Sequence, residues 1–292
     1  MGRIIVGMDG SECAAVALRW AVEEGERRDW PVTALLAWSY LRQYHPDRRD
    51  AVETEYDEGF AAAALDAYVV DVLGAEAAGA VGREVAYDEP DVALVEAAED
   101  ASLLVVGSHG YGGIRGVVMG SVSQRCLHHS TVPVAVVRDN GDSAEVVEGK
   151  VVVGVDGSST SMAALQWAVD EARSRNGYVE VVHSWLLPAA FGYPTLAMPD
   201  PALYESAAED LVSRMLESVD VSGLSRPVSR VIIGGESTAG LIAARAENAE
   251  LVVVGSRGVG GFRGMLIGSV AHQLAHHAPC PLVVLPAVDS SV

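Results

Sequence analysis

The chain repeats itself once, with a period of about half its length. The segment RIIVGMDGSECAAVALRWAVEEG, which begins at Arg3, aligns without a gap with KVVVGVDGSSTSMAALQWAVDEA, which begins at Lys150. A solenoid stacks repeats of about 20–45 residues, whereas this period is as long as a domain. The sequence therefore predicts two domains in tandem, at residues 1–139 and 150–288, joined by a polar, acidic linker at 140–149. Trp38 and Trp185 keep the same offset, and the later pairs Gly107 with Gly255 and Pro133 with Pro281 are shifted by one residue.

Short apolar runs rich in β-branched residues alternate with helical patterns in each copy. In the first copy we expect strands at 3–8, 31–38, 83–86, 102–107 and 133–138, and helices at 13–28, 51–73, 91–100 and 119–129. The second copy predicts strands at 151–155, 178–184, 228–233, 251–255 and 282–285. Strands that alternate with helices are joined by right-handed crossovers and form a parallel sheet covered on both faces. The expected fold class is α/β, with two tandem doubly wound domains.

The charge balance limits the classes of partner. Twenty Lys and Arg residues against 40 Asp and Glu residues give a formal net charge of −20. Because such a field repels polyanions, we expect neither nucleic acid nor anionic membrane surfaces as partners. The field would repel a nucleotide as well. Any phosphate site therefore needs donors close at hand, and backbone N–H groups are the natural source.

The cysteines and the first residues bear on location. Cys13, Cys126 and Cys280 are odd in number and form no CxxC pair, so they predict neither a disulfide framework nor a zinc site. The start, MGRIIVGMDG, does not match a secretory signal. No apolar run approaches the ~18 residues of a membrane span. We expect a cytoplasmic protein.

A glycine-rich loop follows the fourth predicted strand of each copy. The loops read GSHGYGGIRGVVMGSVS at 107–123 and GSRGVGGFRGMLIGSVA at 255–271, and both fit G-x2-G-x9-G-S. Glycine permits close approach of backbone to a ligand, and open α/β sheets bind ligands at the carboxyl ends of their strands. The last Gly and Ser open a helix, whose free N–H groups favour an anion. The loops therefore predict a phosphate site in each copy.

Two familiar nucleotide motifs do not fit these loops. No GK[ST] follows the glycines, as a Walker loop requires, and the loops do not come after the first strand, as a dinucleotide G-x-G-x-x-G does. Each first strand ends instead in an aspartate, in VGMDGS and VGVDGS.

These motifs resemble the universal stress protein family, in its ATP-binding branch, and the tandem arrangement resembles the two-domain members from actinobacteria. The strand-end aspartate motif, the G-x2-G-x9-G-S-V loop and the strand that follows it, which opens with proline and a branched apolar residue, occur in the same order in both copies. The resemblance implies a five-stranded sheet in each domain, with strand order 3-2-1-4-5. It also implies one ATP per domain, lying across strands one and four.

The resemblance also implies site residues. In the first copy, groups near the adenosine, ribose and phosphates would be Asp9, Gly10, Ala37, Val106, Gly107, Gly110, Gly120, Ser121, Val122 and Ser123. In the second copy they would be Asp156, Gly157, Ser184, Val254, Gly255, Gly258, Gly268, Ser269 and Val270. Ala37 and Ser184 would meet the adenine through their backbones. The copies depart from one another at Ser123, where the second copy has Ala271 and so lacks a hydroxyl.

Basic side chains occupy matching places in the two loops. Arg115 and Arg263 are equivalent, as are His109 and Arg257. Each is a candidate for contact with the terminal phosphate, because an arginine clamp is a common way to hold phosphate. The alternative interpretation is a solvated loop charge.

Two further patterns bear on metal binding. Asp9 and Asp156 are candidates to orient the ribose or to bind Mg²⁺ through water, and the alternative is an acid at a helix N-terminus. His272 and His276 are four residues apart on a predicted helix, but no glutamate completes an H-E-x-x-H motif. We interpret these histidines as structural and assign no metal ligand.

The resemblance implies that the chain binds ATP, with Mg²⁺ accompanying the nucleotide, and that it is a regulator of stress response or dormancy. We assign no catalytic residue. A rapid ATPase needs a placed base, a lysine on the phosphates or an arginine finger, whereas the sequence presents a glycine cradle, an arginine and an aspartate. The alternative is a slow ATPase or a nucleotidyl-handling enzyme of the related adenine-nucleotide hydrolase fold. The sequence does not identify a protein partner.

The last strand of each copy bears on assembly. In a sheet ordered 3-2-1-4-5 the apolar segments 131–139 and 280–288 would form sheet edges with unpaired backbone groups. The simplest cover is pairing between them, which predicts an intramolecular pseudo-twofold dimer of the two domains. A homodimer of whole chains is a further option.

Overall fold

A computed structural model describes residues 2–38, 57–110, 119–138, 146–185, 200–235, 237–260 and 266–287. The chain divides into two compact units, unit 1 at Met1–Gly141 and unit 2 at Asp142–Val292. Within the described ranges, none of the helices combines the length and the hydropathy that crossing a membrane requires. The predicted pairing between the two copies stays a prediction.

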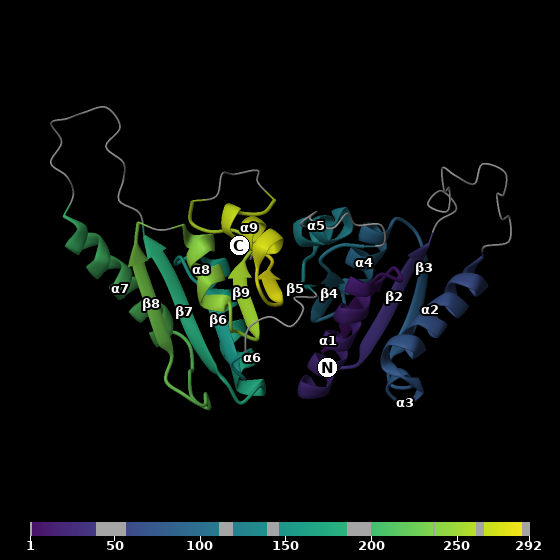
Figure 1. Cartoon of the computed structure of the whole chain (residues 1–292). Helices are drawn as coiled ribbons and strands as arrows, with labels where there is room; N and C mark the ends of the chain where they lie inside the picture. The colour runs from purple at the N-terminus through teal and green to yellow at the C-terminus, as the bar shows by residue number, and fades with distance from the viewer. Residues whose placement is uncertain are drawn as a thin grey trace. The chain divides into compact units, whose positions relative to one another are not determined.

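Unit 1 is one parallel sheet with helices between its strands (Figure 1). Its strands lie in the order β3-β2-β1-β4-β5. The described elements are β1 (Ile4–Met8), α1 (Glu12–Arg28), β2 (Val32–Trp38), α2 (Glu58–Leu73), α3 (Ala75–Ala78), β3 (Gly82–Tyr87), α4 (Pro90–Ala98), β4 (Leu103–Gly107), α5 (Ser121–His129) and β5 (Val134–Val137).

Unit 2 repeats this arrangement, with strands in the order β8-β7-β6-β9-β10. Numbered within its own unit, this order is again 3-2-1-4-5, so the predicted fold class is confirmed. The described elements are β6 (Lys150–Gly154), α6 (Ser159–Ser174), β7 (Tyr178–Trp185), α7 (Pro201–Glu217), β8 (Ser229–Gly234), α8 (Thr238–Ala246), β9 (Leu251–Gly255), α9 (Ser269–His277) and β10 (Leu282–Leu285).

Helices cover both faces of each sheet, which explains why the central strands β1, β4, β6 and β9 are buried along nearly their whole length. In unit 1, α1 and α2 pack on one face and α4 and α5 on the other; α6 with α7, and α8 with α9, do the same in unit 2. The central strand β1 has Ile4 and Ile5 fully buried. Small residues on α1, among them Ala17 and Ala21, are fully buried too and let the helix approach the sheet closely.

Helix boundaries follow local capping. Asp57 accepts a hydrogen bond from the N–H of Phe60 and starts α2, so the described part of the helix expected at 51–73 begins at Glu58, and 51–56 lie outside the described residues. The helix expected at 119–129 begins at Ser121. The short helix α3 was not predicted. It follows Gly74, whose φ of +78° ends α2 in a conformation that suits glycine.

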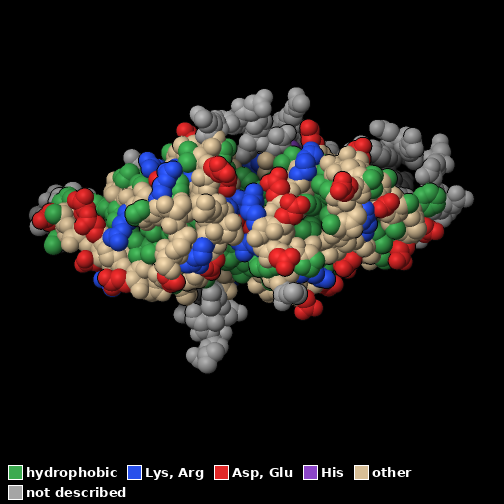
Figure 2. Space-filling view, turned by 90° about the horizontal axis from the view of Figure 1, so that it is seen from below, with side chains coloured by type: hydrophobic (Ala, Val, Ile, Leu, Met, Phe, Trp, Pro, Cys, Tyr) green, Lys and Arg blue, Asp and Glu red, His purple; other side chains and the backbone are tan. Residues whose placement is uncertain are grey.

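Charged groups are interspersed on the surface. On the face shown in Figure 2, acidic and basic side chains alternate over short distances. The excess of acidic residues is therefore not gathered in a single stripe on that face.

A buried ion network distinguishes unit 2 from unit 1. Glu180 on β7 receives a bidentate pair of hydrogen bonds from Arg245, each 2.8 Å long. Its Oε1 also lies 3.6 Å from Nζ of Lys150, which donates to Oδ1 of Asn248. The side chains of Glu180 and Lys150 are 5% and 7% exposed. In unit 1 the position equivalent to Glu180 is Thr33, so a neutral side chain stands there.

Replacing Glu180 with Gln is expected to lower the stability of unit 2 by about 2–3 kcal/mol, because a buried ammonium loses its counter-charge. Burial alone would oppose ionisation of Glu180, but the hydrogen bond from Arg245 and the charge of Lys150 outweigh it and hold the pKa of this carboxyl below its usual range. The stabilisation is therefore present above the unfolded pKa of about 4.3 and is lost as the pH falls through the lower folded value. Urea unfolding at pH 7 and at pH 3 measures both effects.

The matched control is Asp170→Asn. Asp170 pairs with Arg173 at 2.7 Å on the surface of the same unit, where their side chains are 49% and 35% exposed. This loss should stay below about 1 kcal/mol. Equal effects of the two substitutions would show that burial of the Glu180 network contributes nothing.

Candidate functional site

The helix that follows the fourth strand of each unit begins with a glycine in place of a capping side chain. Gly120 precedes α5 and Gly268 precedes α9, and neither helix has a side-chain hydrogen bond at its N-cap. The neighbouring helices α1 and α6, by contrast, are capped by Ser11 and Ser158, whose hydroxyls accept from first-turn N–H groups. The first turns of α5 and α9 therefore present N–H groups and positive dipole ends that favour an anion.

The backbone of each capping glycine is fixed against the loop that follows the fourth strand. The N–H of Gly120 donates to the carbonyl of Ser108 at 2.7 Å, and that of Gly268 to the carbonyl of Ser256 at 2.6 Å. A Cβ at Gly120 would lie 3.3 Å from Cα of His109, which leaves little room for a side chain. These glycines thus allow the start of each helix to lie close to the loop. The hydrogen-bond donors available to an anion are the backbone N–H groups of the residues that follow them.

A second pair of glycines lies against the strand-end aspartates. A Cβ at Gly110 would lie 2.4 Å from Oδ2 of Asp9, and a Cβ at Gly258 would lie 2.2 Å from Oδ2 of Asp156. A larger residue at either position would therefore displace the aspartate side chain or the loop. In each unit this contact joins the ends of strands one and four at the point where the strand order reverses, which is where open α/β sheets form a ligand crevice.

In unit 2, Asp156 accepts hydrogen bonds from both sides of this contact. Its Oδ1 accepts from the N–H and hydroxyl of Ser158, at 3.0 and 2.7 Å, and its Oδ2 accepts from the N–H of Val259 at 2.7 Å. Partial burial opposes ionisation, but the hydrogen bonds from Ser158 and Val259 hold the pKa of this carboxyl below its usual range. Asp156 therefore stays ionised and ties the turn after β6 to the loop after β9.

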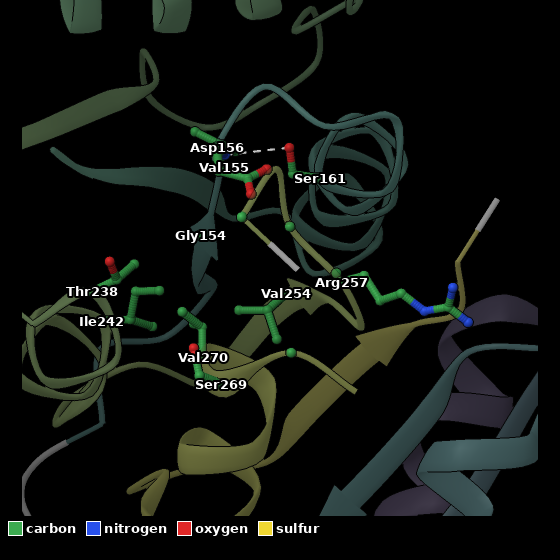
Figure 3. A pocket seen from close by; sticks show the side chains of 14 residues that line it. Gly154, Val155, Asp156, Ser161, Thr238, Ile242, Val254, Arg257, Ser269 and Val270 are labelled. Carbon is green, nitrogen blue, oxygen red and sulfur yellow. Dashed lines mark hydrogen bonds between the residues drawn. The ribbon is translucent and has the colours of Figure 1, made fainter. Parts of the chain in front are cut away.

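A cavity of about 370 Å³ opens at this point of unit 2 (Figure 3). Its volume is in the range of small-molecule sites, about 300–1,000 Å³. In Figure 3, Ile242 from α8 and Val254 from β9 face one another across it, with Ser269 and Val270 at the start of α9 beside them. The lining residues are Gly154, Val155, Asp156, Ser161, Thr238, Ile242, Val254, Gly255, Arg257, Gly258, Gly260, Gly268, Ser269 and Val270.

The structure brings most of the predicted residues of the second copy to this cavity. Those that line it are Asp156, Val254, Gly255, Gly258, Gly268, Ser269 and Val270. Gly157 and Ser184 are not among the lining residues; Gly157 has a φ of +88° in the turn after β6. The candidate Arg257 lines the cavity, but its guanidinium points away from Val254 and Thr238 in Figure 3. Arg263 lies outside the described residues.

The sequence analysis did not identify the contribution of α8. Thr238 and Ile242 line the cavity one helical turn apart. The spacing of these residues at i and i+4 was available as a signal, because it places both on one face of a helix. Only the sheet order, however, shows that α8 contacts β6, so that this face meets the crevice.

In unit 1 the predicted residues lie at the carboxyl ends of β1, β2 and β4 and at the start of α5. These are Asp9, Gly10, Ala37, Val106, Gly107, Gly110, Gly120, Ser121, Val122 and Ser123. The hydroxyl of Ser123 donates to the carbonyl of Gly107 at 2.6 Å and is buried. Since a hydroxyl has one proton, that side chain is not a phosphate donor in this arrangement. Arg115 lies outside the described residues.

His109, the other basic candidate of unit 1, contacts protein groups. Its Nε2 lies 3.3 Å from Sγ of Cys13, and its Nδ1 lies 2.9 Å from Oγ of Ser108. Cys126 and Cys280 are buried, and burial raises the pKa of each thiol to about 12. These two cysteines are packed core residues. Among the described residues, no group of three or more His, Cys, Asp or Glu side chains is placed to hold a metal ion.

Comparison with known proteins identifies the family. Residues 1–138 and 149–286 each match the model of the Universal stress protein family. The chain belongs to this family. Universal stress protein Rv2623 of Mycobacterium tuberculosis (strain H37Rv) is 34% identical over 293 residues, which cover 96% of this chain and 95% of that protein. Universal stress protein Rv1996 of the same strain is 30% identical, covering 96% and 94%.

The resemblance to tandem universal stress proteins of actinobacteria is thereby confirmed, since these mycobacterial relatives match over nearly their full lengths. A solved universal stress protein from Archaeoglobus fulgidus DSM 4304 has the same fold, with a TM-score of 0.63 at 21% identity. It covers 97% of this chain and 98% of its own.

Replacing Asp156 with Asn should lower the stability of unit 2 by about 1–2 kcal/mol at pH 7, since an amide cannot accept all three hydrogen bonds without placing its own N–H₂ against a donor. For a unit near 150 residues, this lowers the melting temperature by about 2–8 °C. Because the pKa of Asp156 is lowered on folding, the difference from the parent should shrink as the pH drops below about 3.9. Scanning calorimetry at pH 7 and pH 3 gives both values.

Asp220→Asn serves as the control. Asp220 accepts from the N–H of Ser222 at 2.9 Å in a similar turn, but it is fully exposed and far along the chain from the crevice. Its replacement should leave the melting temperature nearly unchanged. A melting temperature of the Asp156 variant equal to that of the parent at pH 7 would refute a structural role for this carboxylate.

Proposed function

We propose that each unit binds one ATP with its phosphates at the glycine-capped start of α5 or α9, and that the chain is a nucleotide-dependent regulator of stress response or dormancy. The observation that carries the proposal is the combination of a helix start without a side-chain cap and a crevice beside it, lined in unit 2 by apolar walls. Family membership supports the biological role. We place the function in the cytoplasm, as the cysteine content suggests.

The phosphates would be held by backbone donors in the first turn of α9. In unit 2 the N–H of His272 donates to the carbonyl of Gly268 and so makes the first hydrogen bond of the helix. The N–H groups of Ser269 and Val270 come before it and have no acceptor within the helix. The hydroxyl of Ser269 adds a donor at the same place. Local donors of this kind answer the problem set by the net charge of −20, because their dipoles act at contact distance whereas the protein's field is screened by salt.

The nucleoside would lie along the apolar part of the cavity. Val155, Ile242 and Val254 offer carbon surface for a purine and a ribose. Such a lining with a few placed polar groups is typical of small-molecule sites. Asp156 stands at the edge of this surface as the charged group of the lining closest to the strand ends.

Mg²⁺ would arrive with the triphosphate, whose charge it neutralises. In unit 2, Asp156 already accepts three hydrogen bonds from the protein, so its carboxylate has little capacity left for a direct metal bond. A water between the ion and Asp156 fits this donor set. Asp156 therefore fits a Mg²⁺ ion that is bound by the nucleotide and contacts the protein through water.

Unit 1 is proposed to bind in the same way through α5. The first-turn N–H groups of Ser121, Val122 and Ser123 correspond to those of α9. Since the hydroxyl of Ser123 is committed to Gly107, the change to Ala271 in unit 2 removes an internal hydrogen bond and leaves the proposed phosphate donors alike in the two units.

The stoichiometry of ATP binding tests the proposal. Gly120→Glu would place a carboxylate where the phosphates of unit 1 belong, and Gly268→Glu would do so in unit 2. The parent chain should bind two ATP, each single variant one, and the double variant none, with circular dichroism showing all four folded. Isothermal titration calorimetry with Mg-ATP gives the count.

The neutral variants Gly120→Gln and Gly268→Gln are the matched controls, because glutamine has the size of glutamate without its charge. If phosphates occupy the site, glutamate should weaken binding more than glutamine does, by about tenfold or more. Binding of two ATP by the folded double glutamate variant would refute the phosphate assignment.

A further inference from the structure

The two units differ at the side of the crevice that lies toward β7. In unit 2, Oγ of Ser184 on β7 and Oγ1 of Thr238 lie 2.5 Å apart, which is a short hydroxyl–hydroxyl hydrogen bond. Thr238 is the first residue of α8 and lines the cavity (Figure 3). The hydroxyl of Thr238, held by Ser184 from outside the lining, therefore stands beside Ile242 on the cavity wall.

Unit 1 has no hydroxyl at either equivalent position. Ser184 pairs with Ile233 one residue before the end of β7, and Ala37 pairs with Ala86 at the same place in β2. The first residue of α4 is Pro90, where α8 has Thr238. Proline also lacks the N–H that threonine has. At these two positions unit 2 has side chains that form hydrogen bonds, whereas unit 1 has side chains made only of carbon and hydrogen.

The sheet order shows which part of a nucleotide would meet this pair. The strands of unit 2 run β7-β6-β9, and the proposed phosphate donors follow β9 at the start of α9. Ser184, which fixes Thr238, lies on β7, at the other side of the central strand. A nucleotide with its phosphates at α9 therefore extends across β6 and directs its base toward Thr238.

The hydroxyl pair suits an amino group on that base. One proton is used in the bond between the two hydroxyls, and one remains, together with free lone pairs on both oxygens. Whichever hydroxyl donates, Oγ1 of Thr238 keeps a lone pair that can accept from an amino group. Leaving such a polar pair without a partner against a bound base would cost free energy.

We propose that Thr238, positioned by Ser184, is a specificity-determining residue of unit 2 that accepts a hydrogen bond from the exocyclic amino group of adenine. The inference rests on the proposed binding of ATP. It makes the two sites of the chain unequal, because unit 1 has Pro90 and Ala37 at these positions and recognises the base without this contact.

The test compares ATP with purine riboside triphosphate, which lacks the amino group, in the full chain carrying Gly120→Glu so that only unit 2 binds. Thr238→Val keeps the shape and removes the acceptor. It should weaken ATP binding by about three- to tenfold and change the affinity for purine riboside triphosphate by less than about twofold. Ser184→Ala should reproduce the same selective loss, and combining the two substitutions should add little to it.

The matched control places Thr238→Val in the chain carrying Gly268→Glu, where only unit 1 binds; ATP affinity should not change there. Equal losses for ATP and purine riboside triphosphate, or no loss for either, would overturn the assignment of Thr238. If Thr238→Val does not fold by circular dichroism, the selective loss in Ser184→Ala decides. Absence of ATP binding by the parent chain would instead refute the proposed function itself.

Discussion

The contact between the aspartate after the first strand and the glycine after the fourth strand is the constraint on which each crevice depends. Gly258 approaches Asp156 so closely that a methyl group would not fit between them, and Gly110 stands in the same relation to Asp9. The sheet order places these two strand ends side by side, and the helices that follow them leave on opposite faces. The parallel topology opens the crevice, and the carboxylate fixes the loop at its edge.

The same contact explains how an acidic chain can present an anion site. With a net charge of −20, the protein as a whole disfavours a polyphosphate. The ionised Asp156 is directed into backbone donors of its own turn and of the loop, which offsets its charge locally. The first turn of α9, uncapped by any side chain, then adds positive potential at the crevice beside that of Arg257. The arrangement separates the charge that holds the loop from the dipoles that would hold a ligand.

The two units share the backbone features that form the crevice and differ in the side chains around it. The strand order, the glycine N-caps and the aspartate contacts are the same in both units. Single positions differ: Thr33 is replaced by Glu180 in a buried ion network. Near the crevice, Pro90 of unit 1 is replaced by Thr238. Such differences alter stability and ligand contacts without altering the fold, because they change side chains and leave the strand order and the glycine contacts of the backbone as they are.

The strand order was implied by the resemblance to the universal stress protein family. The repeat and the hydrophobic pattern were sufficient to predict the fold class, since alternating strands and helices have few parallel solutions. They did not predict side-chain partners. Glu24 is fully buried with Arg28 at 2.6 Å, a pairing that the sequence pattern did not reveal because charged residues are normally exposed. Likewise, the bond from Ser123 to Gly107 and the place of Thr238 depend on distances across the sheet that spacing along the chain does not contain.

The account's central claim is that N–H groups at the starts of α5 and α9 hold the phosphates. Amide chemical shifts measure this directly in an NMR titration of the full chain with Mg-ATP. The amides of Ser121, Val122, Ser269 and Val270 should show the largest changes, whereas the first turns of α2 and α7, capped by Asp57 and Asp200, should change little. Saturable binding of ATP that leaves the α5 and α9 amides unmoved would contradict the claim.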